Sequence, residues 1–346
     1  MSNRISNFRE RKGDSKTMSD KQIDGSDAEN VRFVEDTTAW ATWLYYAESR
    51  TQAEVAKALG VSRASVANYL ADARRRGLVT ISLAPDLLDQ ANLSQRLAAR
   101  FGLKGAFIAP HVSEEDGDPT LLRKRLGIAG AQILLSRLRK DMTLGVAWGR
   151  TMLELANALP ERNQESLRVV QVSGSSLGDD ASSPEACTLF IANRLGARCH
   201  NFHAPAVVTT PELRTALLQE PSLKRHFERV HSCSTVVFGV GELNDETRWA
   251  DGNNLIQPSA EDYMKAGAAG IVIGRFIDAQ GDALEGALSG LQIGMELQDL
   301  KAVPERICVA GGEEKLDALH ACLTGGYVTD LVTDRATADR LLREDK

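Results

Sequence analysis

The stretch TQAEVAKALGVSRASVANY, from Thr51 to Tyr69, constrains the fold of this chain more than any other part of it. Thr51, followed three residues later by Glu54, forms a capping-box pattern, in which the two side chains and two backbone N–H groups bond reciprocally at a helix start. Gly60 stands where the first helix has to end in a left-handed conformation, and Ser62 can cap a second helix. The sequence therefore predicts two short helices joined by a tight turn.

Apolar and small side chains in this stretch recur where two crossing helices must touch: Val55, Ala56, Leu59, Val61, Val66 and Tyr69. The face of the second helix turned away from that contact then carries Arg63, Ala64, Ser65, Ala67 and Asn68. An ordinary helical hairpin can show the same apolar spacing. Here the caps, the glycine and the spacing agree, which favours a helix-turn-helix.

The polar face of the second helix offers side chains suited to DNA. Arg63 can form a bidentate contact with guanine and Asn68 with adenine, whereas Gln52 and the start of the second helix suit phosphate. A run such as Arg74 to Arg76 is often only a solvated face, but beside a DNA-binding motif it favours phosphate contact. The predicted DNA-binding residues are Gln52, Ser62, Arg63, Ser65, Asn68, Arg74 and Arg75.

The formal net charge of −6 does not by itself indicate nucleic-acid binding. The charge is distributed unevenly, because residues 31–84 carry seven basic and five acidic side chains whereas residues 85–346 carry 28 and 36. The positive charge therefore lies in the part of the chain that would meet phosphates.

Composition changes along the N-terminal part divide it into two segments. Residues 1–30 are polar and almost free of large apolar side chains, so we expect disorder there, and Met18 is an alternative start. Residues 31–85 form the predicted DNA-binding domain. Within it, Val31 to Glu48 is expected to form a scaffold helix, with Trp40, Trp43, Leu44 and Ala47 at helical spacing. Leu78 to Ala84 alternates apolar and polar residues, which predicts a wing strand.

Residues 86–346 form the predicted effector and oligomerisation domain. Short apolar runs alternate with helical stretches, a pattern typical of a doubly wound, mainly parallel sheet in an α/β fold. The predicted strands are Ala106–Ala109, Thr143–Ala147, Arg168–Val172, Ala197–Phe202, Thr235–Val240, Gly270–Ile273, Arg306–Val309 and Val328–Val332. Such sheets bind ligands at the carboxyl ends of their strands, where this chain has several glycine-containing loops.

The loop that most clearly predicts a ligand site lies between the strand at 143–147 and the helix that follows. Gly149, Arg150, Thr151 and Met152 place backbone N–H groups, a hydroxyl and a guanidinium at a helix start, a combination suited to phosphate. Lys315, after a second pair of glycines, can add a further charge. Glycine loops also serve tight turns alone, so the prediction rests on several of them lying along one sheet edge.

The remaining chemical groups indicate a reduced, soluble protein. Five cysteines show no paired metal spacing, so we expect buried, reduced thiols and a cytoplasmic protein. His200 and His203 fall on opposite faces of the predicted strand, which argues against a metal site. No apolar run is long enough to span a membrane, and no cofactor motif is found.

The chain resembles the SorC family of sugar-responsive transcriptional regulators across most of residues 40–340. The resemblance rests on the helix-turn-helix stretch and on the segments LGVAWGRT, VVQVSGSS, FHAPAVV, VFGVGEL, GAAGIVIGRFIDAQG and VAGGEEKLDALHACLTGGYVTDLVTDRATA, which follow the family's order. It implies a winged helix-turn-helix joined to an effector domain similar to sugar-phosphate isomerases and deaminases. It also implies operator DNA as partner, a sugar, sugar-phosphate or polyol effector, and assembly as a homotetramer. Independently of the resemblance, DNA binding through one small helix-turn-helix predicts a dimer or tetramer.

By position, the resemblance assigns Gly149, Arg150 and Thr151 to the family's phosphate loop and Lys315 to its effector-contacting lysine. Gly174, Ser175 and Gly241 lie in matching loops. Two residues depart from the family's pattern. Arg150 stands where a small residue is common, so it either strengthens phosphate binding or fills the subsite. Ile271 stands where Asp or Glu often accepts hydrogen bonds from sugar hydroxyls.

Two classes of function remain at this point: a ligand-controlled DNA-binding regulator, which the sequence favours, and a sugar-phosphate isomerase or deaminase that carries a DNA-binding module. The enzyme requires a positioned general base. Asp179, Asp180 and Glu242 lie in suitable loops, but such acids are commonly solvated or capping. Lys315 could form a Schiff base, although ion pairing is its simpler role.

Overall fold

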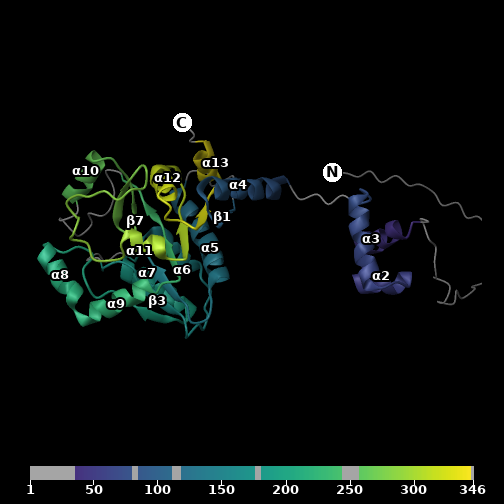
Figure 1. Cartoon of the computed structure of the whole chain (residues 1–346), viewed down its shortest axis with the longest axis horizontal. Coiled ribbons are helices and arrows are strands. Elements are labelled where there is room, and N and C mark those ends of the chain that lie inside the picture. The colour runs from purple at the N-terminus through teal and green to yellow at the C-terminus, as the bar shows by residue number, and fades with distance from the viewer. Residues whose placement is uncertain (1–35, 80–84, 111–117, 176–180, 244–256, 344–346) are drawn as a thin grey trace, which may run out of the picture. The chain divides into compact units, whose positions relative to one another are not determined.

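The computed structural model describes residues 36–79, 85–110, 118–175, 181–243 and 257–343 (Figure 1). The chain separates into two compact units, Met1–Leu83 and Ala84–Lys346. Each unit has its own buried core and is described by itself.

The first unit consists of short helices whose ends are fixed by the residues that the sequence indicates. They are α1 (Thr37–Thr42), the π-helical turn η1 (Trp43–Ala47), α2 (Gln52–Leu59) and α3 (Arg63–Arg75). The capping box at Thr51 is confirmed, Gly60 ends α2 with φ 68°, and Ser62 caps α3. A Cβ at Gly60 would meet nothing within 4 Å, so glycine is favoured there by its backbone conformation rather than by space.

The core of this unit is confirmed for α2 and α3 and differs from prediction in the scaffold helix. Ala41, Leu44, Val55, Val66 and Leu70 are buried together. Of the four residues at helical spacing in the scaffold segment, Leu44 is buried and Trp40 packs against the core, but Trp43 is 57% exposed and Ala47 is exposed as well. The physical reason is that α-helical geometry ends at Thr42 and a wider π-helical turn follows, which changes the angle between successive side chains. The predicted wing falls largely on residues 80–84, outside the described residues.

The second unit is built on a seven-stranded parallel sheet in the order β1-β10-β9-β5-β2-β3-β4. Its strands are β1 (Gly105–Ile108), β2 (Thr143–Val146), β3 (Arg168–Gln171), β4 (Arg198–His200), β5 (Thr235–Phe238), β9 (Glu305–Val309) and β10 (Asp330–Thr333). These match seven of the eight predicted strands to within a few residues at each end, and the mainly parallel α/β sheet is confirmed.

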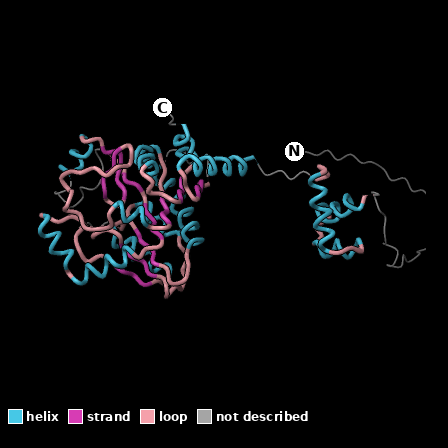
Figure 2. Tube along the Cα trace, in the orientation of Figure 1, coloured by secondary structure: helices cyan, strands magenta, loops and turns pink. Residues whose placement is uncertain are grey.

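Helices enclose this sheet, as Figure 2 shows for the strands in magenta. They are α4 (Pro85–Phe101), α5 (Pro119–Arg137), α6 (Arg150–Ala158), α7 (Pro184–Leu195), α8 (Pro211–Gln219), α9 (Pro221–His231), α10 (Gln257–Lys265), α11 (Leu297–Ala302), α12 (Leu316–Thr324) and α13 (Arg335–Arg343), with the 3₁₀ turn η4 (Glu313–Lys315) before α12. Within the described ranges, none of the helices combines the length and apolar composition that crossing a membrane requires.

Alternate residues of each strand feed two separate cores, which places helices on both faces of the sheet. Val236 and Phe238 of β5 pack with α4, α11, α12 and α13, whereas Val237 between them packs with α5, α6 and α7. Because successive side chains of a strand point to opposite faces, the two clusters are the two faces of one sheet. The strand sequences are continuously apolar because both faces of the sheet are covered by helices.

The predicted strand at 270–273 does not join the parallel sheet. It forms most of β7 (Ala268–Val272), which pairs antiparallel with β6 (Val240–Gly241) and with β8 (Arg275–Asp278) in a small second sheet. The turn between β7 and β8 has positive φ at Ile273 (43°) and Gly274 (86°), the combination that closes a two-residue hairpin. Isoleucine rarely adopts a positive φ, so the sequence contains no recognisable turn signal at Ile273, and neither the hairpin nor β8 was predicted.

Candidate functional site

The outward face of α3 presents the residues predicted to read DNA. Arg63, Ala64, Ala67 and Asn68 are exposed and Ser65 is half-buried. Arg63 Nε donates to Gln52 Oε1 over 3.4 Å, which places the start of α2 beside the start of α3. The structure thus brings Gln52 and Arg63 together, with Asn68 further along the exposed side of the same helix.

Two of the predicted polar residues are engaged within the helix itself. Ser62 Oγ accepts from Ser65 N over 3.0 Å, and the Ser62 and Ser65 hydroxyl oxygens lie 2.9 Å apart. Ser62 therefore fixes the start of α3 whether or not it also meets a phosphate.

The three arginines at the end of α3 have different surroundings. Arg75 is 79% exposed at its side chain and pairs with Asp72 over 2.7 Å. Arg76 bonds to both Asp36, at the start of α1, and Asp72, so it connects the two ends of the unit. Hydrogen bonding to Arg76 lowers the pKa of Asp36, and hydrogen bonding to Arg75 lowers that of Asp72. Arg74 donates to the Leu70 carbonyl over 3.4 Å.

In the second unit, the direction of strand addition changes between two central strands. From β2 the chain adds β3 and β4 on one side, whereas from β5 it adds β9 and β10 on the other. Loops that leave neighbouring strands in opposite directions leave a crevice at their carboxyl ends, where doubly wound sheets bind ligands. The loops after β2, β5 and β9 therefore form the candidate region for an effector site.

A charged cluster joins these loops. Arg150, the first residue of α6, places Nη2 3.6 Å from Glu242 Oε1, and Lys315 in η4 places Nζ 3.5 Å from Glu242 Oε2. Lys315 Nζ also donates to the Val240 carbonyl over 3.0 Å. Lys315 and Glu242 are 13% and 16% exposed at their side chains, whereas Arg150 is 53% exposed. The switch-point cluster, as we name these three residues, carries one net positive charge.

The start of α6 lies in the same place and has no side-chain cap. Gly149 adopts φ 114° and donates its own N–H to the Ser182 carbonyl over 2.9 Å. The first-turn amides of Arg150, Thr151 and Met152 precede the point where helical bonding begins, so they can serve an anion. Thr151 is 5% exposed and Met152 is fully buried, so Met152 offers only its backbone.

Gly174 and Ser175 serve the packing of their loop. A Cβ on Gly174 would lie 2.5 Å from Ala206 Cα, closer than any side chain tolerates. Ser175 Oγ donates to the Phe202 carbonyl over 2.7 Å and accepts from Gln171 Nε2 over 3.3 Å. The backbone N–H of Gly174 donates to the Ile293 carbonyl, and that of Ser175 donates to the Ala204 carbonyl, in the segment that follows β4.

Gly241 and Ile271 face each other across β6 and β7. Ile271 is 3% exposed and packs with Val207, Tyr263, Phe276 and Leu288. Its side chain thus belongs to an apolar core. Gly241 directly precedes Glu242, so its backbone helps to place the carboxylate of the switch-point cluster.

Sequence reasoning named Glu242 only as a loop acid and did not predict that it joins Arg150 and Lys315. The signal was available in the GVGEL loop, since the strand before it lies beside the strand before Arg150. Asp179 and Asp180 lie outside the described residues.

The prediction that His200 and His203 lie on opposite faces of one strand is wrong. β4 ends at His200, so His203 lies beyond the strand, and both residues line one small pocket. Among the described residues, no group of three or more His, Cys, Asp or Glu side chains is arranged to hold a metal ion. The five cysteines are free thiols, four of them buried.

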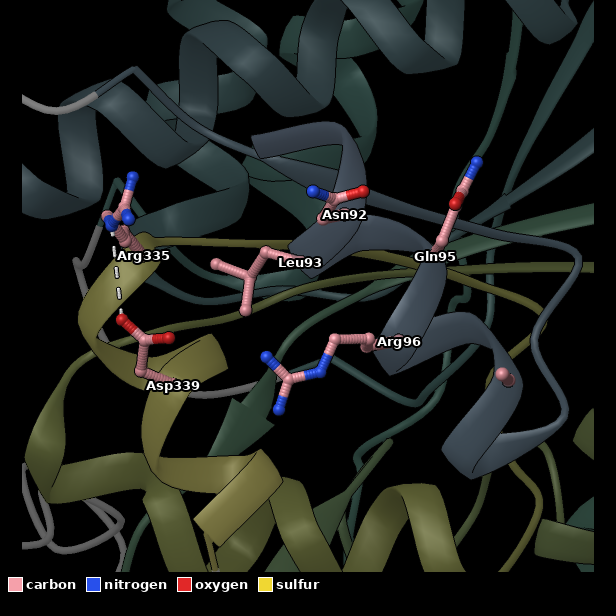
Figure 3. A pocket seen from close by; sticks show the side chains of 7 residues that line it. Asn92, Leu93, Gln95, Arg96, Arg335 and Asp339 are labelled. Atoms are coloured by element: carbon pink, nitrogen blue, oxygen red, sulfur yellow. Dashed lines mark ion pairs between the residues drawn. The ribbon is translucent and has the colours of Figure 1, made fainter. Parts of the chain in front are cut away.

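A separate pocket of ≈ 620 Å³ lies between α4 and α13 (Figure 3). Asn92, Gln95 and Arg96 of α4 line one side, and Arg335 and Asp339 of α13 pair with each other on the other. None of the predicted effector residues lines it. The converging charges, the uncapped helix start and the switch point favour the cluster around Glu242 as the effector site.

Comparison with known proteins identifies the family of the chain. The family model described as "Putative sugar-binding domain" matches residues 86–343. A transcriptional regulator of Escherichia coli named YjhU is 33% identical over 92% of this chain and 98% of its own length. The sorbitol operon regulator of Klebsiella pneumoniae is 30% identical over 87% of this chain and 95% of its own. The crystal structure of that full-length regulator, SorC, matches with a TM-score of 0.69 and 27% identity, covering 88% of this chain and 98% of the other.

The family match and these relatives define a transcriptional regulator with a sugar-binding domain, and they favour this class over the enzyme alternative. More narrowly, the chain belongs to the SorC family of sugar-responsive transcriptional regulators.

Proposed function

We propose that this regulator binds operator DNA through α2 and α3 as a helix-turn-helix, and that a small phosphorylated sugar or polyol bound at the switch-point cluster controls its operator affinity. The observation that carries the proposal is the meeting of Arg150, Glu242 and Lys315 beside the uncapped start of α6. The protein acts in the cytoplasm and needs no cofactor.

The proposed DNA binding rests on the different positions of the polar residues along α3. Arg63 and Asn68 are exposed near the start of the helix and can reach base edges. Ser65 lies on the same face as these two base-reading candidates, whereas Gln52, Ser62, Arg74 and Arg75 supply contacts to phosphate, and the side chain of Arg75 is 79% exposed. Residues 31–85 would thus form the DNA-binding domain and residues 86–346 the effector domain.

The effector part rests on charge and hydrogen-bonding capacity. The cluster's net positive charge and the amides of Arg150, Thr151 and Met152 suit a phosphate group. Glu242 can accept hydrogen bonds from sugar hydroxyls, the role that Ile271, buried in its apolar core, does not fill. A relative that regulates a sorbitol operon supports a polyol or its phosphate as the chemical class.

The enzyme alternative requires a general base that is available to the substrate. Glu242 is paired with the two cations of the proposed phosphate site, one at each of its carboxylate oxygens. Because both its oxygens are engaged by cations, Glu242 suits the binding of an effector better than proton transfer to or from a substrate.

We also propose that the protein works as a homo-oligomer, a dimer or a tetramer. One small helix-turn-helix buries too little surface for tight specific binding, and two half-sites raise the avidity.

Two measurements test the proposed function. Fluorescence anisotropy with DNA from upstream of the protein's own gene should show tighter binding than with a scrambled duplex of equal length. Incubation with a panel of phosphorylated sugars and polyols should raise the melting temperature without product formation. Turnover of a panel compound would favour the enzyme, and equal affinity for both duplexes would contradict the DNA-binding role.

A further inference from the structure

A second, smaller pocket of ≈ 210 Å³ lies at the edge strand β4 and has no residue in common with the switch-point cluster. His200 and His203 approach it from the end of β4 and the loop beyond, and His226 and Arg229 approach it from α9. Cys199, Asn201 and Ser222 complete its polar lining.

Among the described residues that line this pocket, Arg229 carries the permanent charge. Arg229 lowers the pKa of both His200 and His226, and Arg168 and Arg198, at the starts of β3 and β4, lower the pKa of His200. Arg168 donates only to Thr143 Oγ1 and the Asp141 carbonyl, and Arg229 only to the Arg225 carbonyl. In the part of the chain that the structure describes, no carboxylate pairs with any of these three guanidinium groups.

Hydrogen bonds orient the donors of this pocket. His226 Nε2 lies 2.8 Å from the Gln171 carbonyl and must donate to it, since a carbonyl can only accept. Asn201 Oδ1 accepts from the Cys199 thiol over 3.2 Å, which leaves the Asn201 amide N–H groups available. His200 Nε2 is buried without a partner among the described residues. An unpaired buried nitrogen is costly, so a ligand that accepts a hydrogen bond there removes the cost.

We propose that this pocket binds a small oxyanion of the size of phosphate or sulfate, held by Arg229, the Asn201 amide and the imidazoles of His200, His203 and His226. An oxyanion supplies the acceptors and the negative charge that these groups lack. A metal ion is the poorer ligand, because the described side chains include no three-ligand group placed to hold one.

The histidines make this binding dependent on pH. Burial, followed by the charge of Arg229, lowers the pKa of both His200 and His226, so both imidazoles are neutral near neutral pH. His203, on the loop beyond β4, adds a weaker effect of the same sign on His226. A bound anion stabilises the protonated imidazole, so binding takes up protons and tightens as the pH falls.

The test uses the full-length protein, isothermal titration calorimetry and sulfate, whose charge is constant over the range in which histidines titrate. The background variant Arg150→Glu removes anion binding at the switch-point cluster, which separates the two sites. In that background, sulfate should bind once per chain, more tightly at about pH 6 than at about pH 8. Arg229→Gln should weaken it roughly ten- to hundredfold.

Arg225→Gln is the matched control, because Arg225 is an exposed arginine of the same helix outside the pocket, and it should leave sulfate binding unchanged. His203→Gln, at an exposed position of the pocket lining, gives a second variant in case Arg229→Gln alters folding, and it should weaken binding. The absence of sulfate binding in the Arg150→Glu background, equal binding by the Arg229 and Arg225 variants, or Zn²⁺ binding without sulfate binding overturns the proposal.

Discussion

Glu242 Oε2 lies 3.5 Å from Lys315 Nζ, although Glu242 follows β6 of the small sheet and Lys315 follows β9 of the large sheet. The same carboxylate faces Arg150 through its other oxygen. An anionic ligand that enters the switch-point cluster therefore meets two cations already paired with a carboxylate, and Glu242 competes with it for both. The effector affinity should thus depend on the charge of Glu242 as strongly as on that of Lys315.

Glu242→Gln should tighten the binding of a phosphorylated effector by about tenfold, because it removes a negative charge while keeping a hydrogen-bonding side chain. Lys315→Gln should weaken the same binding by a similar factor. Calorimetry with the most stabilising compound of the panel measures both. Glu212→Gln, at an exposed position of α8, is the control. Weaker binding by both cluster variants would mean that Glu242 holds the ligand's hydroxyl groups more than it opposes its phosphate.

Arg63→Ala should cost about 1–3 kcal/mol on the operator and relax the preference for one base pair. Arg75→Ala should weaken operator and random duplexes alike and reduce the slope of the salt dependence by about one. Anisotropy titrations at several salt concentrations distinguish these effects. Identical losses on both duplexes for the two variants would show that the assigned roles are wrong.

Arg76→Ala should lower the stability of the first unit, since Arg76 bonds to Asp36 and Asp72. Its effect on DNA affinity should be smaller than that of Arg75→Ala, which removes a guanidinium 79% exposed to solvent. Thermal melting measures the change in stability, and anisotropy on the same preparation measures the change in DNA affinity. A large loss of affinity with unchanged melting would place Arg76 among the phosphate contacts.

Gly174→Ala should destabilise the second unit by about 1–3 kcal/mol, because its Cβ would lie 2.5 Å from Ala206 Cα, a backbone atom that cannot move aside easily. Gly239→Ala is the matched control, since the nearest atom to its Cβ would be the Val309 carbonyl oxygen at 3.4 Å. Urea unfolding measures both. Equal stability of the two variants would show that the Gly174 loop relaxes.

Stability should fall as the pH decreases below about 6.5, the ordinary pKa of histidine. The pKa of His226 is lowered in the folded protein, mainly by burial, so the unfolded chain binds a proton more readily and acid favours unfolding. His226→Gln keeps a donor for the Gln171 carbonyl and should lose part of this dependence. Melting temperatures of both proteins across the acidic range test it, and parallel curves would mean that other groups cause the acid sensitivity.

Much of the fold could be predicted because the signals are local. Thr51, Gly60 and Ser62 bond to residues three or four positions away, and continuously apolar strands indicate a sheet covered on both faces. The placement of Arg150 and Lys315 at the same edge of the sheet could be predicted because the loops that carry them both follow the carboxyl ends of parallel strands. Three features could not be predicted, because each depends on contacts or backbone geometry that no local pattern records: the pairing of Glu242 with both cations, the hairpin at Ile273, and the π-helical turn that exposes Trp43.

The central claim, that the switch-point cluster binds the effector and thereby controls DNA binding, is tested most directly by titrating the operator complex with phosphorylated sugars and polyols and with their unphosphorylated counterparts. Wild type and Arg150→Glu are compared by anisotropy, since Arg150 is 53% exposed and tolerates the change. We predict that both bind the operator equally and that only wild type changes its affinity, in response to a phosphorylated compound. A response of Arg150→Glu at the wild-type concentration, or a wild type that answers only to unphosphorylated compounds, would contradict the account.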